Sequence, residues 1–102
     1  MSTVKIAIHP GTILKEEFMA PLGITQADLA DRIGVSRRRI NEIVNGRRSI
    51  TADTAKRLSK AFGNSAMHWL NMQNLFDLNS LSEPKGIRRI RGRANSEDAV
   101  TG

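Results

Sequence analysis

The sequence predicts an all-α fold of five short helices built around a central helix-turn-helix. Two amphipathic segments lie close together in residues 26–45 and are joined through a short turn that contains a glycine. Apolar residues also recur at helical spacing before and after this region. The chain has 102 residues, 39% of them hydrophobic, which suits one compact core and is too little for two ordinary domains. We therefore expect one domain over residues 9–80, an N-terminal arm at residues 1–8 and a flexible basic tail at residues 81–102.

The N-terminal arm is predicted because residues 1–8 alternate weakly between polar and apolar side chains, as a short, loosely packed extended segment would. The first helix should cover residues 10–20. Pro10 suits its first position, because the missing N–H would be unpaired there in any case. The inward face is predicted to carry Ile13, Leu14 and Phe18. Pro21 and Gly23 should end the helix.

The two helices of the central motif should share one apolar core. The side chains expected in it are Leu29, Ala30, Ile33, Ile40, Ile43 and Val44. Ala30 lets the two axes cross closely, and Gly34 relieves the backbone where helix becomes tight turn. Thr25, with Asp28 three residues on, is a plausible cap for the first helix, and Ser36 is a good N-cap for the second. Gly46 should follow the end of the second helix.

The second helix of the motif presents a polar arc of about 140° opposite its apolar side. The residues predicted to contact DNA bases from this arc are Arg37, Arg38, Asn41, Glu42 and Asn45. Arginine can bridge guanine, asparagine can pair with adenine and glutamate can accept from cytosine. Charges alone would favour an ordinary solvated helix face. The small-residue, glycine and apolar pattern together favours a recognition helix in the DNA major groove.

A second set of polar residues is predicted to contact the DNA backbone. It comprises Gln26, Ser36, Arg39, Arg47 and Arg48. Gln26 begins the first helix of the motif and can donate to a phosphate across the groove, although a surface residue without a role is the alternative. Arg47 and Arg48 follow the recognition helix in a loop that would lie beside the phosphates.

The last two predicted helices differ in character. The fourth begins after Thr51 as its N-cap, ends at Gly63 and has a single apolar stripe. The fifth begins after Ser65, which can cap it, runs to about Leu78 and is apolar almost all round. Because so small a domain offers one core, its second apolar face indicates a partner chain. The alternative is that the tail folds back over this face.

Charge and composition narrow the function class. The net charge of +6 and the pI near 10.8 favour a polyanionic partner. The basic block in the tail, between residues 85 and 93, can contact DNA or an acidic partner, or remain solvated. There is no cysteine, and neither a signal peptide nor a membrane-spanning run is visible, which indicates a cytoplasmic protein. No residue pattern points to catalysis, a metal or a cofactor, so we do not expect an enzyme.

The residues 9–78 resemble the HigA-type antitoxins, also called virulence-associated protein I, of the Xre and phage-repressor helix-turn-helix family. The middle of the chain carries ITQADLADRIGVSRRRINEIVNGRRSIT and DTAKRLSKAFGNS, which are common to the wider family. The opening HPGTILKEEF and the ending HWLNMQNLFDL are far more specific. Thr12 stands where relatives usually carry Glu, and Phe76 replaces the commoner Tyr, and neither change should disturb the fold. The tail lies outside the resemblance.

This resemblance implies a five-helix, phage-repressor-like bundle that dimerises through its C-terminal helical region. Carried onto this chain, the dimer interface would comprise Trp69, Leu70, Met72, Leu75 and Phe76. The family members bind a palindromic operator in double-stranded DNA, repress their own operon and neutralise HigB, a RelE-like messenger-RNA endonuclease toxin. The same role is therefore expected here. The alternatives are a stand-alone Xre-family regulator without a toxin, and a toxin-masking interaction module with weak DNA binding.

Overall fold

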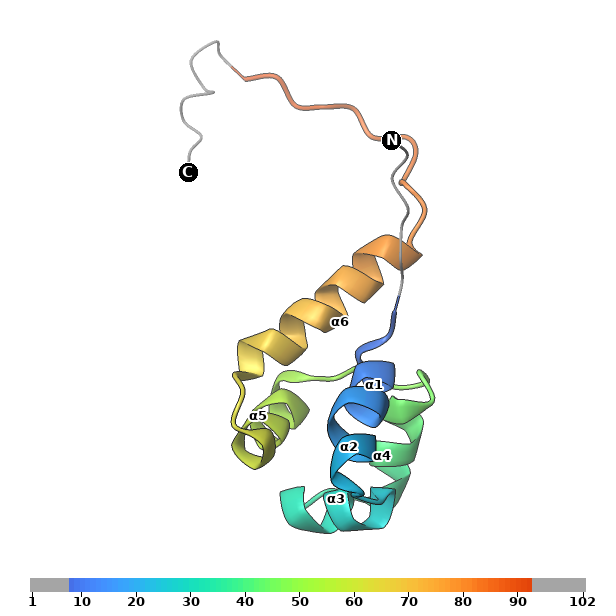
Figure 1. Ribbon diagram of the computed structural model, residues 1–102. Helices are drawn as coiled ribbons and strands as arrows, with labels where there is room; N and C mark the ends of the chain where they lie inside the picture. The colour runs from blue at the N-terminus through green and yellow to red at the C-terminus, as the bar shows by residue number, and fades with distance from the viewer. Residues whose placement is uncertain (1–7, 93–102) are drawn as a thin grey trace.

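The computed structural model describes residues 8–92, and every regular element in that range is helical (Figure 1). Three short segments follow one another without a break and form the first helix of the bundle. They are α1 (Pro10–Ile13), the wider π-helical turn η1 (Leu14–Met19) and α2 (Ala20–Leu22). The others are α3 (Gln26–Ile33), α4 (Arg37–Val44), α5 (Ala52–Phe62) and α6 (Ala66–Ser80). The predicted all-α, five-helix fold is confirmed for residues 8–92.

The first helix is longer than the sequence predicted, because Pro21 lies inside it. A proline in a regular α-helix removes one hydrogen bond and crowds the carbonyl four residues earlier. Here the backbone widens just before Pro21, where the N–H of Ala20 donates to the carbonyl of Lys15, five residues back. The helix ends only at Gly23, whose φ of 66° is left-handed. The expectation that Pro21 would help to end the helix was therefore wrong.

Hydroxyl side chains cap the four remaining helices, as the sequence predicted. Thr25, Ser36 and Ser65 each accept a hydrogen bond of 3.0 Å from the backbone N–H three residues on. Thr51 makes the same contact at 3.4 Å. Gly46, with a φ of 74°, follows the end of α4, and Gly63 follows α5. Helix α6 extends to Ser80, two residues beyond the predicted end.

The core gathers side chains from all five helices. Its fully buried members include Leu14, Leu29, Ile40, Ile43, Leu58 and Trp69. The ring of Trp69 packs against Phe18, with 4.9 Å between centroids, and its indole N–H donates to Asn64 at 3.0 Å. Trp69 was expected at a dimer interface. That expectation is wrong, because the side chain is 0% exposed in the single chain and offers no surface to a partner.

Helix α6 lies across one end of the bundle and has two apolar sides (Figure 1). Its inner side carries the buried Trp69 and Gln73. Its outer side leaves Met67, Leu75 and Leu78 at 60% exposure or more. Three further residues of the predicted dimer interface, Leu70, Met72 and Phe76, are half-buried between these sides.

Beyond α6, residues 81–92 form no helix or strand and are exposed throughout. They run away from the bundle, as Figure 1 shows. The predicted arm, apart from Ile8, and the predicted end of the tail lie outside the described residues. None of the helices within residues 8–92 is long and apolar enough to cross a membrane.

Candidate nucleic-acid interface

One side of α4 is an open polar surface. Arg37, Arg38, Asn41 and Asn45 are exposed on it, while Ile40, Ile43 and Val44 are buried on the opposite side. The structure thus brings together four of the five residues predicted to contact bases. We call this surface, with Gln26 from the start of α3, the recognition face.

Amide groups connect the two helices of the motif across the recognition face. The side-chain oxygen of Gln26 accepts a hydrogen bond from the amide of Asn41 at 3.1 Å. The amide of Asn45 donates to the backbone carbonyl of Asn41 at 2.9 Å. Asn41 still has its side-chain oxygen and a second amide hydrogen, which together can form the paired hydrogen bonds that asparagine makes with adenine.

Glu42 differs from its predicted role, because both of its carboxylate oxygens already accept hydrogen bonds within the chain. Oε2 lies 3.0 Å from Nε of Arg38, and Oε1 lies 2.8 Å from both Nε and Nη2 of Arg48. The Glu42 side chain is 22% exposed. Hydrogen bonds from Arg48 first and then Arg38 hold the pKa of this carboxyl below its ordinary value.

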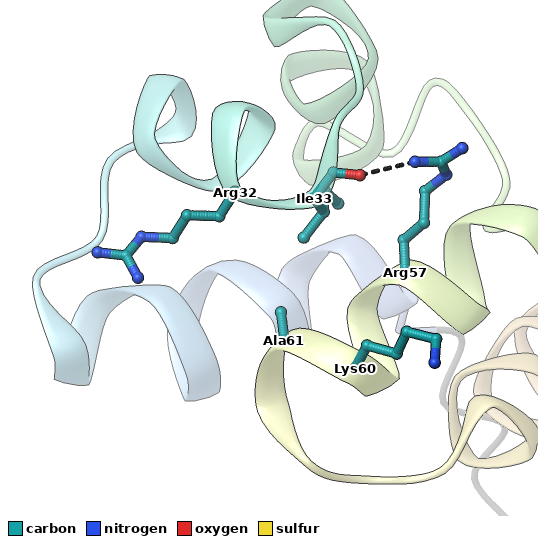
Figure 2. A pocket seen from close by; sticks show the side chains of 5 residues that line it. All are labelled: Arg32, Ile33, Arg57, Lys60 and Ala61. Atoms are coloured by element: carbon teal, nitrogen blue, oxygen red, sulfur yellow. Dashed lines mark hydrogen bonds between the residues drawn. The ribbon is translucent and has the colours of Figure 1, made fainter.

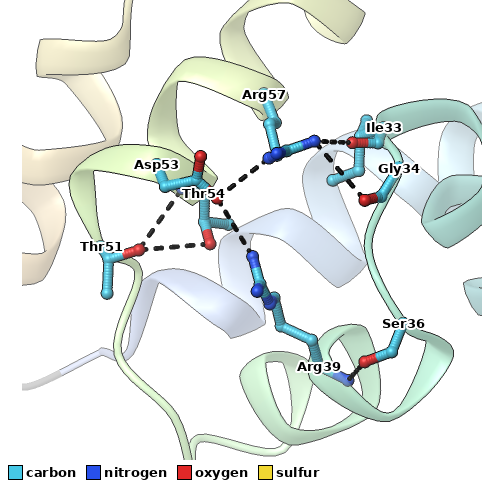
Figure 3. Close-up of polar contacts among 8 residues, drawn as sticks. All are labelled: Ile33, Gly34, Ser36, Arg39, Thr51, Asp53, Thr54 and Arg57. Atoms are coloured by element: carbon cyan, nitrogen blue, oxygen red, sulfur yellow. Dashed lines mark hydrogen bonds and ion pairs between the residues drawn. The ribbon is translucent and has the colours of Figure 1, made fainter.

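Arg39 lies on the side of α4 that faces α5, where Asp53 binds it (Figure 3). The Asp53 oxygen that lies 3.2 Å from Arg39 also lies 2.9 Å from Nε of Arg57. Arg57 in turn donates to the backbone carbonyl of Ile33 at 2.8 Å, at the end of α3. The pKa of Asp53 is lowered, mainly by the hydrogen bond from Arg57. Arg39 therefore links α4 to α5. Its other guanidinium nitrogens can still donate to a DNA phosphate.

Asp53 and Arg57 were not predicted as partners within the motif. Their spacing of four residues on one helix is the usual pattern of an intrahelical ion pair, so the contact between Asp53 and Arg57 could have been predicted. Nothing local connects Arg57 to the turn after α3, because the two segments are 24 residues apart in the chain.

Two residues predicted to contact the DNA backbone, Ser36 and Arg47, flank α4, and Arg37, which was predicted to contact a base, begins it. Arg37 and Arg47 are exposed, and neither forms an ion pair within residues 8–92. The hydroxyl oxygen of Ser36 caps α4 by accepting from the N–H of Arg39. Ser36 therefore has a structural role, while its hydroxyl hydrogen can still donate.

A separate cavity of about 260 Å³ lies between the ends of α3 and α5 (Figure 2). Its lining comprises Arg32, Ile33, Arg57, Lys60 and Ala61. Figure 2 shows the guanidinium groups of Arg32 and Arg57 pointing in opposite directions, so they do not converge on one ligand. Within residues 8–92, no group of three or more His, Cys, Asp or Glu side chains could hold a metal ion.

His9, just before the first helix, contacts both α6 and the loop after α4, and the residue pattern did not indicate this. Its Nδ1 accepts from the N–H of Gly11 at 2.8 Å, and its ring meets Phe76 edge-on, with 4.9 Å between centroids. It also has a hydrogen bond to the backbone of Arg48. The only signal in the sequence was the HPG triplet, which the family resemblance had singled out.

Known proteins are similar to this chain in both sequence and fold. A helix-turn-helix family model matches residues 14–70. Virulence-associated protein I of Dichelobacter nodosus is 52% identical over 79 residues, which cover 78% of this chain and 73% of that protein. Antitoxin HigA-1 of Vibrio cholerae serotype O1 is 40% identical over 76 residues, which cover 74% of this chain and 71% of that protein.

A solved structure, the Pseudomonas aeruginosa antitoxin HigA with the higBA promoter, is 41% identical and has a TM-score of 0.72. The match covers 74% of this chain and 82% of that one. Two of these relatives are named as antitoxins, a non-enzymatic family, in agreement with the prediction that the chain is not an enzyme. The resemblance inferred from sequence motifs is thereby confirmed, and the chain belongs to the HigA-type antitoxins, or virulence-associated protein I proteins, of the Xre and phage-repressor helix-turn-helix family.

Proposed function

We propose that the chain is an antitoxin that represses transcription by placing α4 in the major groove of its operator DNA. The observation that carries this proposal is the recognition face, an exposed polar side of α4 continued by Gln26 on α3. A helix with such a face can read base edges, and the flanking basic residues can bind phosphates. The Pseudomonas aeruginosa HigA structure contains the promoter of its own operon, which supports the same partner for this chain.

The roles within the site follow from exposure and chemistry. The residues that would contact bases are exposed on α4, namely Arg37, Arg38, Asn41 and Asn45. The residues that would contact phosphates lie at the ends of α4 and beside it, namely Gln26, Ser36, Arg39, Arg47 and Arg48. Because the partner is DNA, we expect the protein to work in the cytoplasm.

The outer side of α6 supports a homodimer. Leu75 and Leu78 are exposed there, and a groove of about 210 Å³ lies beside them. The groove is lined by Ile8, Ile13, Met72, Leu75, Phe76 and Asn79. A monomer rarely leaves so much apolar surface open, whereas a two-fold dimer would cover the same patch on both copies. Two recognition helices about 34 Å apart would then read a palindromic operator.

The proposed protein partner is a HigB-like toxin, a messenger-RNA endonuclease of the RelE type. Membership of the HigA antitoxins supports it. The test is to purify the toxin encoded beside this chain and to measure its messenger-RNA cleavage with and without the chain. Cleavage that continues at equimolar chain would contradict the antitoxin role.

The DNA role is tested by measuring affinity for the promoter of the chain's own operon. Asn41→Ala should lose about 1–3 kcal/mol of binding free energy and discriminate less at one base pair. Asn71→Ala is the matched control, because Asn71 is also an exposed asparagine and lies on α6. Equal affinity of the two variants would contradict the recognition role of α4.

A further inference from the structure

Glu42 occupies an unusual place for an acidic residue, since it lies in a surface proposed to bind a polyanion. Its carboxylate contacts two arginines, Arg38 on its own helix and Arg48 in the loop after that helix. The Glu42 side chain is 22% exposed, whereas those of Arg38 and Arg48 are 84% and 46% exposed. The acid is therefore the inner member of the cluster, and the two arginines form its outer surface.

The contacts of Glu42 fix the direction of two long side chains before any partner arrives. Free arginine side chains populate many rotamers, and ordering them opposes binding. The contact with Arg48 is made by two nitrogens, Nε and Nη2, on one carboxylate oxygen, so the plane of the guanidinium is oriented as well as its position. This leaves the remaining nitrogen donors of Arg48 for a phosphate.

The negative charge of Glu42 has the opposite effect, because it repels DNA phosphates. The net result of removing the carboxylate therefore distinguishes three roles. A residue that only lowers the positive charge would weaken DNA binding when present. A residue that reads cytosine would alter the preference at one base pair. A residue that orders Arg38 and Arg48 would strengthen operator binding without changing base preference.

We propose that Glu42 is a positioning residue that pre-orders Arg38 and Arg48 for DNA, and that it does not itself contact a base. This inference rests on the proposed DNA-binding function. Both carboxylate oxygens are already engaged with cations, and the side chain is mostly covered, which leaves Arg38 and Arg48 as the groups nearer the DNA.

The test compares Glu42→Ala and Glu42→Gln with Glu16→Ala by measuring their affinity for the operator, for operators with single base-pair changes and for unrelated duplex. Glu16→Ala is the matched control, because it removes the same charge from an exposed glutamate in η1 that has no ion pair within residues 8–92. We expect Glu42→Ala to bind the operator at least threefold more weakly than Glu16→Ala, with an unchanged order of preference among the operators. Glu42→Gln, which keeps one acceptor oxygen, should fall between them.

A thermodynamic cycle adds a readout that a merely structural role would not change. In a chain that already carries Arg38→Ala and Arg48→Ala, Glu42→Ala should cause no further loss of operator affinity. In the free protein, the Nε–H groups of both arginines should show restricted motion by nuclear magnetic relaxation, and Glu42→Ala should release them.

Three results would overturn the inference while leaving DNA binding intact. They are operator affinity of Glu42→Ala equal to or tighter than that of Glu16→Ala, a changed preference at one base pair, and the same loss in the chain without the two arginines. Failure of the wild-type chain to bind its operator would instead overturn the proposed function, and this inference with it.

Discussion

The side-chain oxygen of Gln73 accepts a hydrogen bond from the backbone N–H of Ile50 at 2.8 Å, inside the core. Gln73 is 4% exposed on the inner side of α6, and Ile50 is 2% exposed in the connection between α4 and α5. The amide of Gln73 donates to Asp77 at 3.0 Å, which fixes the orientation of the group. One polar side chain on the last helix thus satisfies a buried N–H in the connection between α4 and α5.

Gln73→Leu should destabilise the protein by about 1–3 kcal/mol, because the N–H of Ile50 would remain buried without an acceptor. Urea unfolding followed by circular dichroism measures the change. Asn74→Ala, at an exposed neighbouring position, serves as the control and should change stability little. Equal midpoints for the two variants would show that this hydrogen bond contributes nothing.

Gly11→Ala should be destabilising by about 1–3 kcal/mol, because an added methyl group would collide with the backbone carbonyl of Ile43. That contact is where α1 meets α4, so separation of the two helices should also weaken operator binding. Thermal unfolding and operator affinity are the two measurements. Thr12→Ala, at the exposed next position, is the control. A Gly11→Ala chain as stable as the control would contradict the close approach.

The stability of the fold should fall as the pH is lowered below the ordinary histidine pKa of 6.5. Burial lowers the pKa of His9, and the opposing effects of Asp77 and the Arg48 backbone are smaller. The unfolded chain then binds a proton at a higher pH than the folded chain, so the contribution is present above pH 6.5 and is lost as the pH falls through the folded pKa. Protonation would also remove the acceptor that His9 offers to Gly11.

This pH effect is measured by urea unfolding at pH 7.5 and pH 5.5. The window lies above the ordinary pKa of 4.5 for Glu42 and 3.8 for Asp53, both of which are lowered further, so these carboxylates stay ionised throughout it. His9→Asn keeps an N-capping side chain without a titrating ring and should reduce the difference in unfolding free energy between the two pH values. An identical difference in the variant and the wild type would show that His9 is not the cause.

Leu75→Glu should convert the proposed dimer into monomers that remain folded, because Leu75 is 60% exposed on the outer side of α6. Sedimentation velocity measures the change, and operator affinity should fall with it. The control is Leu22→Glu, which places the same charge at a leucine that is 65% exposed at the end of α2. A Leu75→Glu chain that sediments as a dimer would contradict the α6 interface. Trp69→Glu is unsuitable for this test, because it would unfold the core.

Local features of the chain were readable from the sequence. The caps at Thr25, Ser36, Thr51 and Ser65 were predicted correctly, since a hydroxyl side chain satisfies an N–H only three residues away. The polar and apolar sides of α4 were also predicted, because strict helical periodicity decides them. Pro21 was the local exception, since the widened turn before it was not apparent in the residue pattern.

The sequence by itself determined where the helices begin, which side of α4 is exposed and which family the motifs indicate. Only the tertiary structure decided that Trp69 and Gln73 point into the core while Leu75 stays outside, because α6 is apolar on both sides and neighbours distant in the chain choose between them. It likewise decided that Glu42 meets Arg48 and that Asp53 meets Arg39. An ion pair depends on the distance between side chains after packing, which the order of residues along the chain does not fix.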